Sequence, residues 1–184
     1  MSRTWKSPRS LLRRSVKLSL LTAWLALSPL TQADTLRIAY IDPLSGPFAA
    51  VGQNIFNSYQ FLIDKANREK WAGEHKLEMT GFDNKASPQE SLNVLKNVID
   101  KGYRVIVQGN SSGVGLALIE AINKYNERNP GKEVLYLNHT AVDPDMTNSK
   151  CSFWHFRFDA HADMRMAALM EVVREDKALK SVYL

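Results

Sequence analysis

The sequence predicts an α/β fold with a parallel, doubly wound sheet. After residue 33, short apolar runs alternate with longer amphipathic runs, in the order βαβαβαβ followed by a further αβ pair. Strands that alternate with helices are joined by right-handed crossovers, which give a parallel sheet covered on both faces. Ligands bind such sheets at the carboxyl ends of the strands. No internal repeat or low-complexity linker breaks the pattern, so we expect one domain over residues 34–184.

Residues 1–33 have the features of a secretory signal peptide. Six basic residues precede the first acidic residue, Asp34. The apolar stretch 18–30 then follows, and it is shorter than the roughly 20 residues that a membrane-spanning helix needs. Small residues at Thr31 and Ala33 stand three and one positions before a cleavage site. We therefore expect export, with the signal cleaved after about Ala33.

The basic character of the chain belongs to this signal. The chain has 24 Lys and Arg and 19 Asp and Glu, and removal of the six basic residues of the signal leaves 18 basic residues. A domain with this balance lacks the positive charge that nucleic-acid binding requires, so no nucleic-acid partner is expected. Cys151 is the only cysteine, which excludes an intrachain disulfide and a Cys-rich metal site.

The first predicted strand, Leu36–Ile41, ends at the turn-forming residues 42–47. We expect a helix after it, because apolar residues recur there at three and four positions and so share one helix face. That face consists of Ile55, Tyr59, Leu62, Ile63 and Ala66. Core packing explains these apolar residues without a ligand.

A second strand is predicted at Lys76–Phe82, and the helix after it begins with a capping pattern. Ser87 can cap this helix, Pro88 suits its first position, and Glu90 completes a capping box. We expect Gly102 to end the helix in a left-handed turn. The buried face consists of Leu92, Leu95, Val98 and Ile99.

The rest of the chain continues the alternation. Apolar strands are predicted at Arg104–Val107, Val134–Leu137 and Ser181–Leu184. The helix between the first two has its apolar face at Leu116, Ile119, Ile122 and Tyr125. We expect residues 153–158 to be extended and Asp159 to cap a helix that runs to about Glu175.

Polar loops follow three of the predicted strands, over residues 45–52, 109–113 and 138–143. In a parallel sheet these loops should open on one edge. Ser111, Ser112 and the free backbone amides after them could bind an anion such as a carboxylate, because a helix amino terminus offers unpaired donors and partial positive charge. The alternative is that Ser112 only caps the helix.

The same loop also fits a hydrolase pattern. Residues 109–113 read Gly-x-Ser-x-Gly, which would make Ser111 a nucleophile. No His-Gly-Gly-Gly stretch offers an oxyanion hole, and a catalytic triad would have to use Asp143 or Asp145 with His155 or His161. We therefore expect no catalytic residue.

Two further kinds of site are considered and not expected. The residues 109–115 lack the lysine of a phosphate-binding loop, which argues against a nucleotide. Residue types found in metal sites cluster at His155, Asp159, His161 and Asp163, but helix capping and solvation explain them more simply. We expect neither a metal nor a cofactor.

Several motifs carry a family resemblance when they are taken in order from Leu36 to the end of the chain. They are Arg37-Ile38-Ala39-Tyr40 leading into Pro43 to Gly52, Asp83-Asn84 before Ser87-Pro88, Ile106-Val107 with Ser111 to Val114, Pro144 to Thr147, and Phe156-Arg157. Together they resemble the amino-terminal lobe of the type I periplasmic solute-binding proteins of ABC importers, in particular the branched-chain amino acid-binding proteins.

The resemblance implies two α/β lobes that close on a ligand, with residues 34–184 as the first lobe and the second lobe absent. The ligand contacts that we expect from it are Ser111, Ser112, Thr140, Ala141, Val142 and Phe48. Two residues depart from the family, in which a hydroxyl-bearing residue is usual at Val142 and a glycine at Asp42.

The function implied by the resemblance is the binding of a small carboxylate-bearing solute, such as a branched-chain amino acid, without catalysis. The protein would act in the periplasm and deliver the solute to the membrane permease of an ABC importer. The alternatives are the ligand-binding domain of a sensory receptor and an exported serine hydrolase that uses Ser111.

Overall fold

The computed structural model describes residues 34–175, 178 and 181. The predicted signal over residues 1–33 and all but the first residue of the strand predicted at 181–184 lie outside the described residues. The elements are β1 (Thr35–Asp42), α2 (Ala49–Arg68), β2 (Lys76–Asp83), α3 (Pro88–Asp100), β3 (Val105–Gln108), α4 (Ser112–Arg128), β4 (Leu135–Asn138), η1 (Pro144–Thr147), β5 (His155–Arg157) and α5 (Ala162–Glu175). Within these residues, no helix has both the length and the apolar character to cross a membrane.

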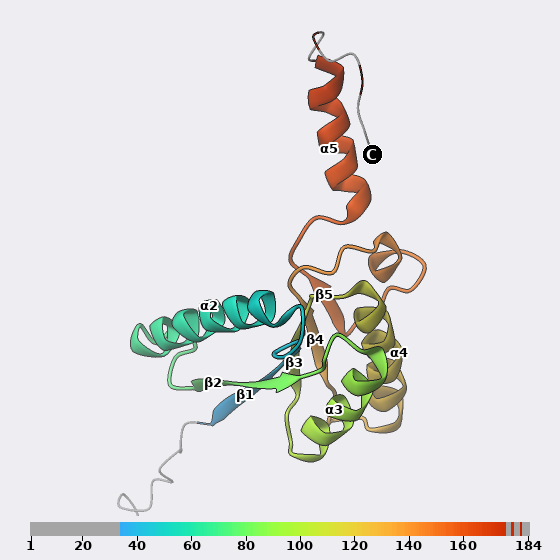
Figure 1. Cartoon of the computed structure of the whole chain (residues 1–184). Helices are drawn as coiled ribbons and strands as arrows, with labels where there is room; N and C mark the ends of the chain where they lie inside the picture. Colours follow the sequence, from blue (N-terminus) through green and yellow to red (C-terminus); the bar gives the residue numbers. More distant parts are fainter. Residues whose placement is uncertain (1–33, 176–177, 179–180, 182–184) are drawn as a thin grey trace, which may run out of the picture. The chain divides into compact units, whose positions relative to one another are not determined.

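The five strands form one sheet in the order β2-β1-β3-β4-β5, and every neighbouring pair is parallel. Helix α2 covers one face of the sheet, and α3 and α4 cover the other (Figure 1). The predicted α/β fold with a parallel, doubly wound sheet is therefore confirmed. Because all strands run the same way, the loops after β1, β3 and β4 lie at one edge of the sheet.

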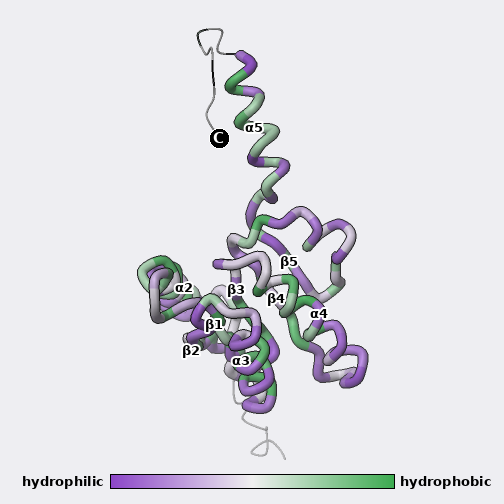
Figure 2. Tube along the Cα trace, turned by 45° about the vertical axis from the view of Figure 1, so that its right-hand side comes forward, coloured by the Kyte–Doolittle hydropathy of each residue, from purple (hydrophilic) through white to green (hydrophobic). Residues whose placement is uncertain are grey.

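The two apolar cores follow the alternation of side chains along the strands. In β1, Ala39 and Ile41 pack with α3 and α4, whereas Tyr40 points to the opposite face and packs with α2. The helices show the matching pattern, with apolar segments alternating with polar ones along the tube (Figure 2). Both faces of the central strands are thus buried, which explains why these strands are almost continuously apolar.

The capping of α3 agrees with the sequence at both ends but not in every bond. The Ser87 side chain accepts from the Glu90 N–H at 3.4 Å, and Gly102 has the expected positive φ of 86°. The second hydrogen bond of the predicted capping box, from the Ser87 N–H to the Glu90 carboxylate, is not formed. The Ser87 N–H donates to the Asn84 carbonyl, and the Glu90 carboxylate accepts from the Asn93 side chain.

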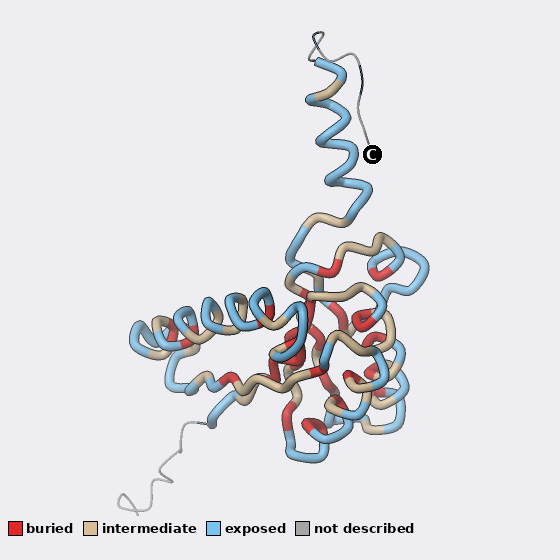
Figure 3. The backbone as a smooth tube through the Cα atoms, in the orientation of Figure 1, coloured by how far each residue is buried: buried red, intermediate tan, exposed pale blue. Residues whose placement is uncertain are grey.

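Three other expectations are corrected by the structure. Leu62 is 46% exposed, so the buried face of α2 runs through Ile63 and Ala66. The polar loop expected to run to residue 52 is shorter, since α2 begins at Ala49. Asp159 does not cap α5, whose first turn is capped by the His161 ring nitrogen accepting from the Met164 N–H at 3.3 Å. Helix α5 has no buried residue (Figure 3).

Candidate functional site

A cavity of about 140 Å³ lies at the carboxyl edge of the sheet, between the loops after β3 and β4 and the first turns of α2. Its lining residues are Val51, Ile55, Gly109, Asn110, Ser112, Thr140, Ala141 and Val142. Four of the six residues expected to contact a ligand, from two loops about 30 residues apart in the sequence, are therefore brought together here. The other two, Ser111 and Phe48, do not line the cavity.

Ser111 and Ser112 have different roles. Ser111 is the N-cap of α4, and its hydroxyl oxygen accepts from the Val114 N–H at 3.4 Å. The alternative in which Ser112 only caps the helix is therefore wrong, because the capping serine is Ser111. The Ser112 hydroxyl oxygen accepts from the Asp143 N–H at 3.2 Å, which leaves its own hydrogen free to donate to a ligand.

The bonds of Ser111 do not assemble a hydrolase triad. In the described part of the chain, its hydroxyl bonds the Val114 amide and no histidine. Of the proposed partners, Asp143 accepts from the Asp145 N–H at 2.9 Å, and His155 packs against the Tyr136 ring at 4.9 Å.

Asp42 is a buried residue of the site whose role the sequence did not predict. It ends β1 with no exposed surface, and its carboxylate accepts hydrogen bonds from the end of β3 and from the loop after it. The donors are the N–H groups of Gly109 at 3.3 Å and Asn110 at 3.1 Å and the Gln108 side-chain amide at 3.3 Å. The His139 Nε2 lies 2.7 Å from one of the carboxylate oxygens. Its only signal in the sequence was the departure from the glycine usual in the family.

His139 joins Asp42 to the cavity. Its Nε2 bonds Asp42, and its Nδ1 bonds the Thr140 hydroxyl. Its ring stacks on Tyr40 with centroids 6.1 Å apart and meets the edge of Tyr59 at 5.9 Å. Burial raises the pKa of both tyrosines, and the Asp42 carboxylate raises each of them further. Both phenols therefore stay uncharged at neutral pH.

Gly109 lets the two loops approach closely. A Cβ atom on this residue would lie 2.6 Å from the Thr140 backbone nitrogen and 2.7 Å from the His139 Nδ1. A Cβ atom does not approach other heavy atoms this closely, so the loop after β3 can lie against the loop after β4 only where a glycine stands.

Phe48 lies just before α2 as its N-cap residue and is 53% exposed. Its position at the start of the helix is near in sequence to the lining residue Val51, but Phe48 itself does not contribute to the cavity wall. Its contact with a ligand stays a prediction.

The residues considered as metal ligands lie in different surroundings. His155 is buried beside Tyr136, Asp159 pairs with Arg165, and His161 caps α5. Among the described residues, no group of three or more His, Cys, Asp or Glu side chains is placed to hold a metal ion.

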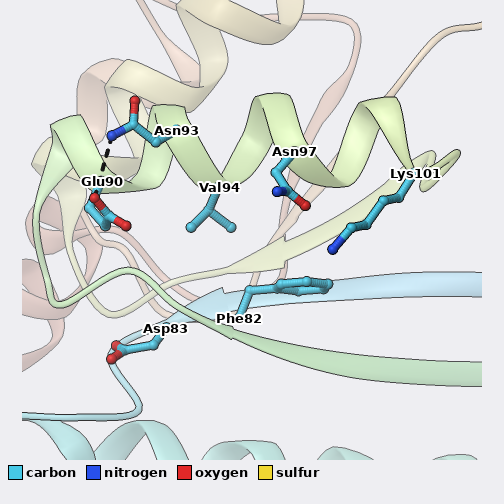
Figure 4. A pocket seen from close by; sticks show the side chains of 7 residues that line it. All are labelled: Phe82, Asp83, Glu90, Asn93, Val94, Asn97 and Lys101. Carbon is cyan, nitrogen blue, oxygen red and sulfur yellow. Dashed lines mark hydrogen bonds between the residues drawn. The ribbon is translucent and has the colours of Figure 1, made fainter.

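A larger hollow of about 320 Å³ lies between α3 and the end of β2. Asn97 of α3 and Lys101, the residue after α3, face Phe82 across it (Figure 4), and the Lys101 ammonium lies 5.9 Å from the Phe82 ring centre. None of the residues predicted to bind a ligand lines this hollow, so the smaller cavity is the better candidate.

Comparison with known proteins agrees with this geometry. A family described as periplasmic binding protein matches residues 35–184. The Leu/Ile/Val-binding protein homolog 4 of Brucella abortus is 36% identical over 143 residues, covering 78% of this chain and 34% of that protein. The Leu/Ile/Val-binding protein BraC3 of Rhizobium johnstonii is 30% identical over 127 residues, covering 69% of this chain and 32% of that protein. The chain thus spans about a third of the length of these relatives.

A solved structure gives the same result for the fold. The leucine-, isoleucine-, valine-, threonine- and alanine-binding protein of Brucella ovis, in a closed conformation, matches with a TM-score of 0.74 and 36% identity. The match covers 81% of this chain and 38% of that one. With its all-parallel sheet and its match over residues 35–184, the chain belongs to the periplasmic binding protein family and has the type I fold.

Proposed function

We propose that this chain is part of the solute-binding component of an ABC importer and binds a small carboxylate-bearing solute, such as a branched-chain amino acid. The observation that carries the proposal is the cavity in which Ser112 meets the loop residues 140–142. The names of the relatives support an amino acid as the solute. The family is one of binding proteins, which supports binding without catalysis.

The carboxylate of the solute would lie at the start of α4. The Ser112 hydroxyl has a hydrogen to donate there, and the first-turn amides of a helix carry partial positive charge. Val51 and Ile55, on the α2 side of the cavity, would contact an aliphatic side chain. The ligand contacts expected at Thr140, Ala141 and Val142 are compatible with this orientation because these residues line the same cavity.

Calorimetric titration with L-leucine, on a protein that has both lobes, tests the proposal. Leucinamide, which lacks the carboxylate, should bind much more weakly than leucine. Ser112→Ala should weaken leucine binding by roughly tenfold to a hundredfold, because a hydrogen bond to a charged group contributes about 1.5–3 kcal/mol. Ser149→Ala, at an exposed position outside the cavity, is the matched control. A folded protein that binds no amino acid or small organic acid contradicts the proposal, and so does ester hydrolysis that Ser111→Ala abolishes.

We also propose that residues 34–184 form the amino-terminal lobe and that a second lobe closes over the cavity. The support is the length of the relatives, of which the matched part is about a third. Binding by this lobe alone should be weaker than binding by a protein with both lobes, because half of the enclosing surface is missing. Equal affinity of the two would contradict the proposal.

The proposed location is the periplasm, with the signal cleaved after about Ala33 and with the membrane permease of the importer as partner. The composition of residues 1–33 supports export. Mass spectrometry of the exported protein tests the cleavage: a mature chain that begins at Asp34 is expected, and a chain that keeps Met1 contradicts it.

A further inference from the structure

We infer that Asp42 and His139 are positioning residues that set the direction of the Thr140 hydroxyl, and that binding of a ligand carboxylate at Thr140 is coupled to the uptake of one proton by His139. The inference rests on the proposed function and adds a regulation of that same site by pH.

The first step concerns the proton on His139 Nε2. Three of the four partners of Asp42 are the N–H groups of Gly109, Asn110 and the Gln108 side chain, which can only donate. Both carboxylate oxygens therefore act as acceptors. The remaining partner, His139 Nε2 at 2.7 Å, must then be the donor. This fixes the tautomer of the imidazole through the bond on its far side.

The second step concerns the other ring nitrogen. In neutral His139 the Nδ1 has no hydrogen, so it accepts from the Thr140 hydroxyl, whose hydrogen then points away from the ligand. In protonated His139 the Nδ1 donates to the Thr140 oxygen, and the hydroxyl hydrogen becomes free. Thr140 lines the cavity. It therefore offers an acceptor to the ligand in the first state and a donor in the second.

The third step concerns the charges around His139. From β1 it faces Asp42 and Tyr40, and from α2 it faces Tyr59. Both tyrosines are uncharged at neutral pH because burial raises their pKa. The imidazolium would thus meet one anion, Asp42, with their side chains 8% and 0% exposed. At such low exposure the attraction between an imidazolium at His139 and the Asp42 carboxylate would be only weakly screened by salt.

The coupling follows from thermodynamic reciprocity. A carboxylate between Ser112 and Thr140 is favoured by a donating Thr140 hydroxyl, which requires a proton from the solvent on His139 Nδ1. If ligand binding favours protonation, then protonation favours ligand binding to the same extent. The affinity for leucine should therefore fall as the pH rises, by up to about tenfold per pH unit for one linked proton.

The coupling is tested by measuring the leucine Kd of the exported protein from about pH 5 to about pH 8, the range over which imidazole groups titrate. Calorimetry in phosphate and in Tris, which have different enthalpies of ionisation, counts the protons taken up. We expect uptake of a proton on binding and a Kd that rises with pH. Both effects should disappear in His139→Gln, which cannot titrate, and persist in His75→Gln, whose histidine is exposed on a turn before β2.

A second variant protects the test against a folding defect in His139→Gln. Thr140 is exposed, so Thr140→Val should fold normally while losing the pH dependence, and Thr140→Ser should retain it. A pH-independent Kd without proton uptake in the unmutated protein overturns the inference and leaves the proposed function intact.

Nitrogen-15 NMR of the His139 ring gives a measurement that needs no ligand. The unliganded protein at about pH 8 should show the neutral tautomer with hydrogen on Nε2. Hydrogen on Nδ1 instead overturns the inference whatever the binding result. If the tautomer is as expected but no amino acid or small organic acid binds at any pH, the coupling and the proposed function both fail, and only the Asp42–His139 arrangement stands.

Discussion

Asp42 shows how one buried carboxylate can shape a binding edge. It accepts the N–H groups of Gly109 and Asn110, two amides that would otherwise point from the loop after β3 toward a ligand. The anion that accepts hydrogen bonds from these two amides is therefore a side chain of the protein. In the proposed site, a ligand carboxylate would therefore be bound by Ser112, Thr140 and the first turn of α4.

Replacing Asp42 by asparagine should destabilise the protein by about 2–4 kcal/mol. The side-chain NH2 group of the asparagine would face N–H donors, from which a nitrogen that carries hydrogen cannot accept a hydrogen bond. Urea unfolding measures the difference. Asp100→Asn, which makes the same change at an exposed position of α3, should alter the free energy of unfolding by less than about 0.5 kcal/mol. Equal effects of the two substitutions would show that the Asp42 bonds contribute little.

Two glycines in helices give opposite predictions for the same substitution. A Cβ on Gly52 in α2 would lie 1.8 Å from the Pro43 carbonyl oxygen, whereas a Cβ on Gly113 in α4 meets no atom closer than 3.8 Å. We expect Gly52→Ala to cost about 3 kcal/mol or more, and Gly113→Ala to stabilise by about 0.5–1 kcal/mol. Thermal unfolding of both variants checks the pair, and a tolerated Gly52→Ala would mean that α2 can shift away from Pro43.

The residues of the site could be predicted from the sequence only in part. The loops that contain Ser112 and residues 140–142 were expected at one edge because they follow parallel strands, whereas the individual ligand contacts in them came from the family resemblance. The roles of adjacent serines could not be separated, because the N-cap is decided by a backbone conformation that one serine adopts and its neighbour does not. The bonds of Asp42 join residues more than 60 positions apart, and no local pattern encodes them.

Secondary structure elements were more predictable than the bonds at their ends. The predicted strands and helices that the structure describes lie within a few residues of their predicted positions, because apolar periodicity reflects which face is buried. Leu62 was misassigned because its neighbour Ile63 also fits a three-and-four spacing, and only packing against the sheet selects one of them. The capping box at Glu90 failed because Asn84, in the preceding turn, takes the Ser87 amide.

This difference at α3 can be measured with two substitutions. Ser87→Ala removes the side chain that accepts the Glu90 N–H and should lower stability by about 1 kcal/mol. Glu90→Ala should have a much smaller effect, since its carboxylate bonds Asn93 and not the Ser87 amide. Chemical denaturation measures the free energy of unfolding of the two variants. A decrease for Glu90→Ala as large as that for Ser87→Ala would indicate that both hydrogen bonds of the capping box form in solution.

The architecture as a whole followed from the order of elements. Alternating strands and helices required parallel pairing, and the near-continuous apolar character of β1 and β3 required cover on both faces. The order of the elements does not predict which element packs against α5. Its periodicity resembles that of the buried helices, yet its apolar residues, including Met166 and Met170, are about half exposed. Periodicity shows that a helix has an apolar face, but it does not identify the element that packs on it.

The stability of the whole fold should depend on pH through His155, which lies in β5 against the Tyr136 ring. Burial lowers the pKa of His155, and the charge of Arg157 lowers it further. The unfolded chain binds a proton at the ordinary pKa of about 6.5, whereas the folded protein resists protonation until a lower pH. The contribution of His155 to stability is therefore present above that ordinary value and is lost as the pH falls below it.

His155→Phe keeps a ring beside Tyr136 but cannot titrate, so it should reduce the fall in the free energy of unfolding between about pH 7 and pH 5. The difference in slope between the two proteins should not exceed about 1.4 kcal/mol per pH unit, the value for one proton. His75→Gln serves as control because His75 is exposed, and it should leave the slope unchanged. Parallel stability curves for the unmutated protein and His155→Phe would show that β5 opens enough for His155 to be protonated without unfolding of the sheet.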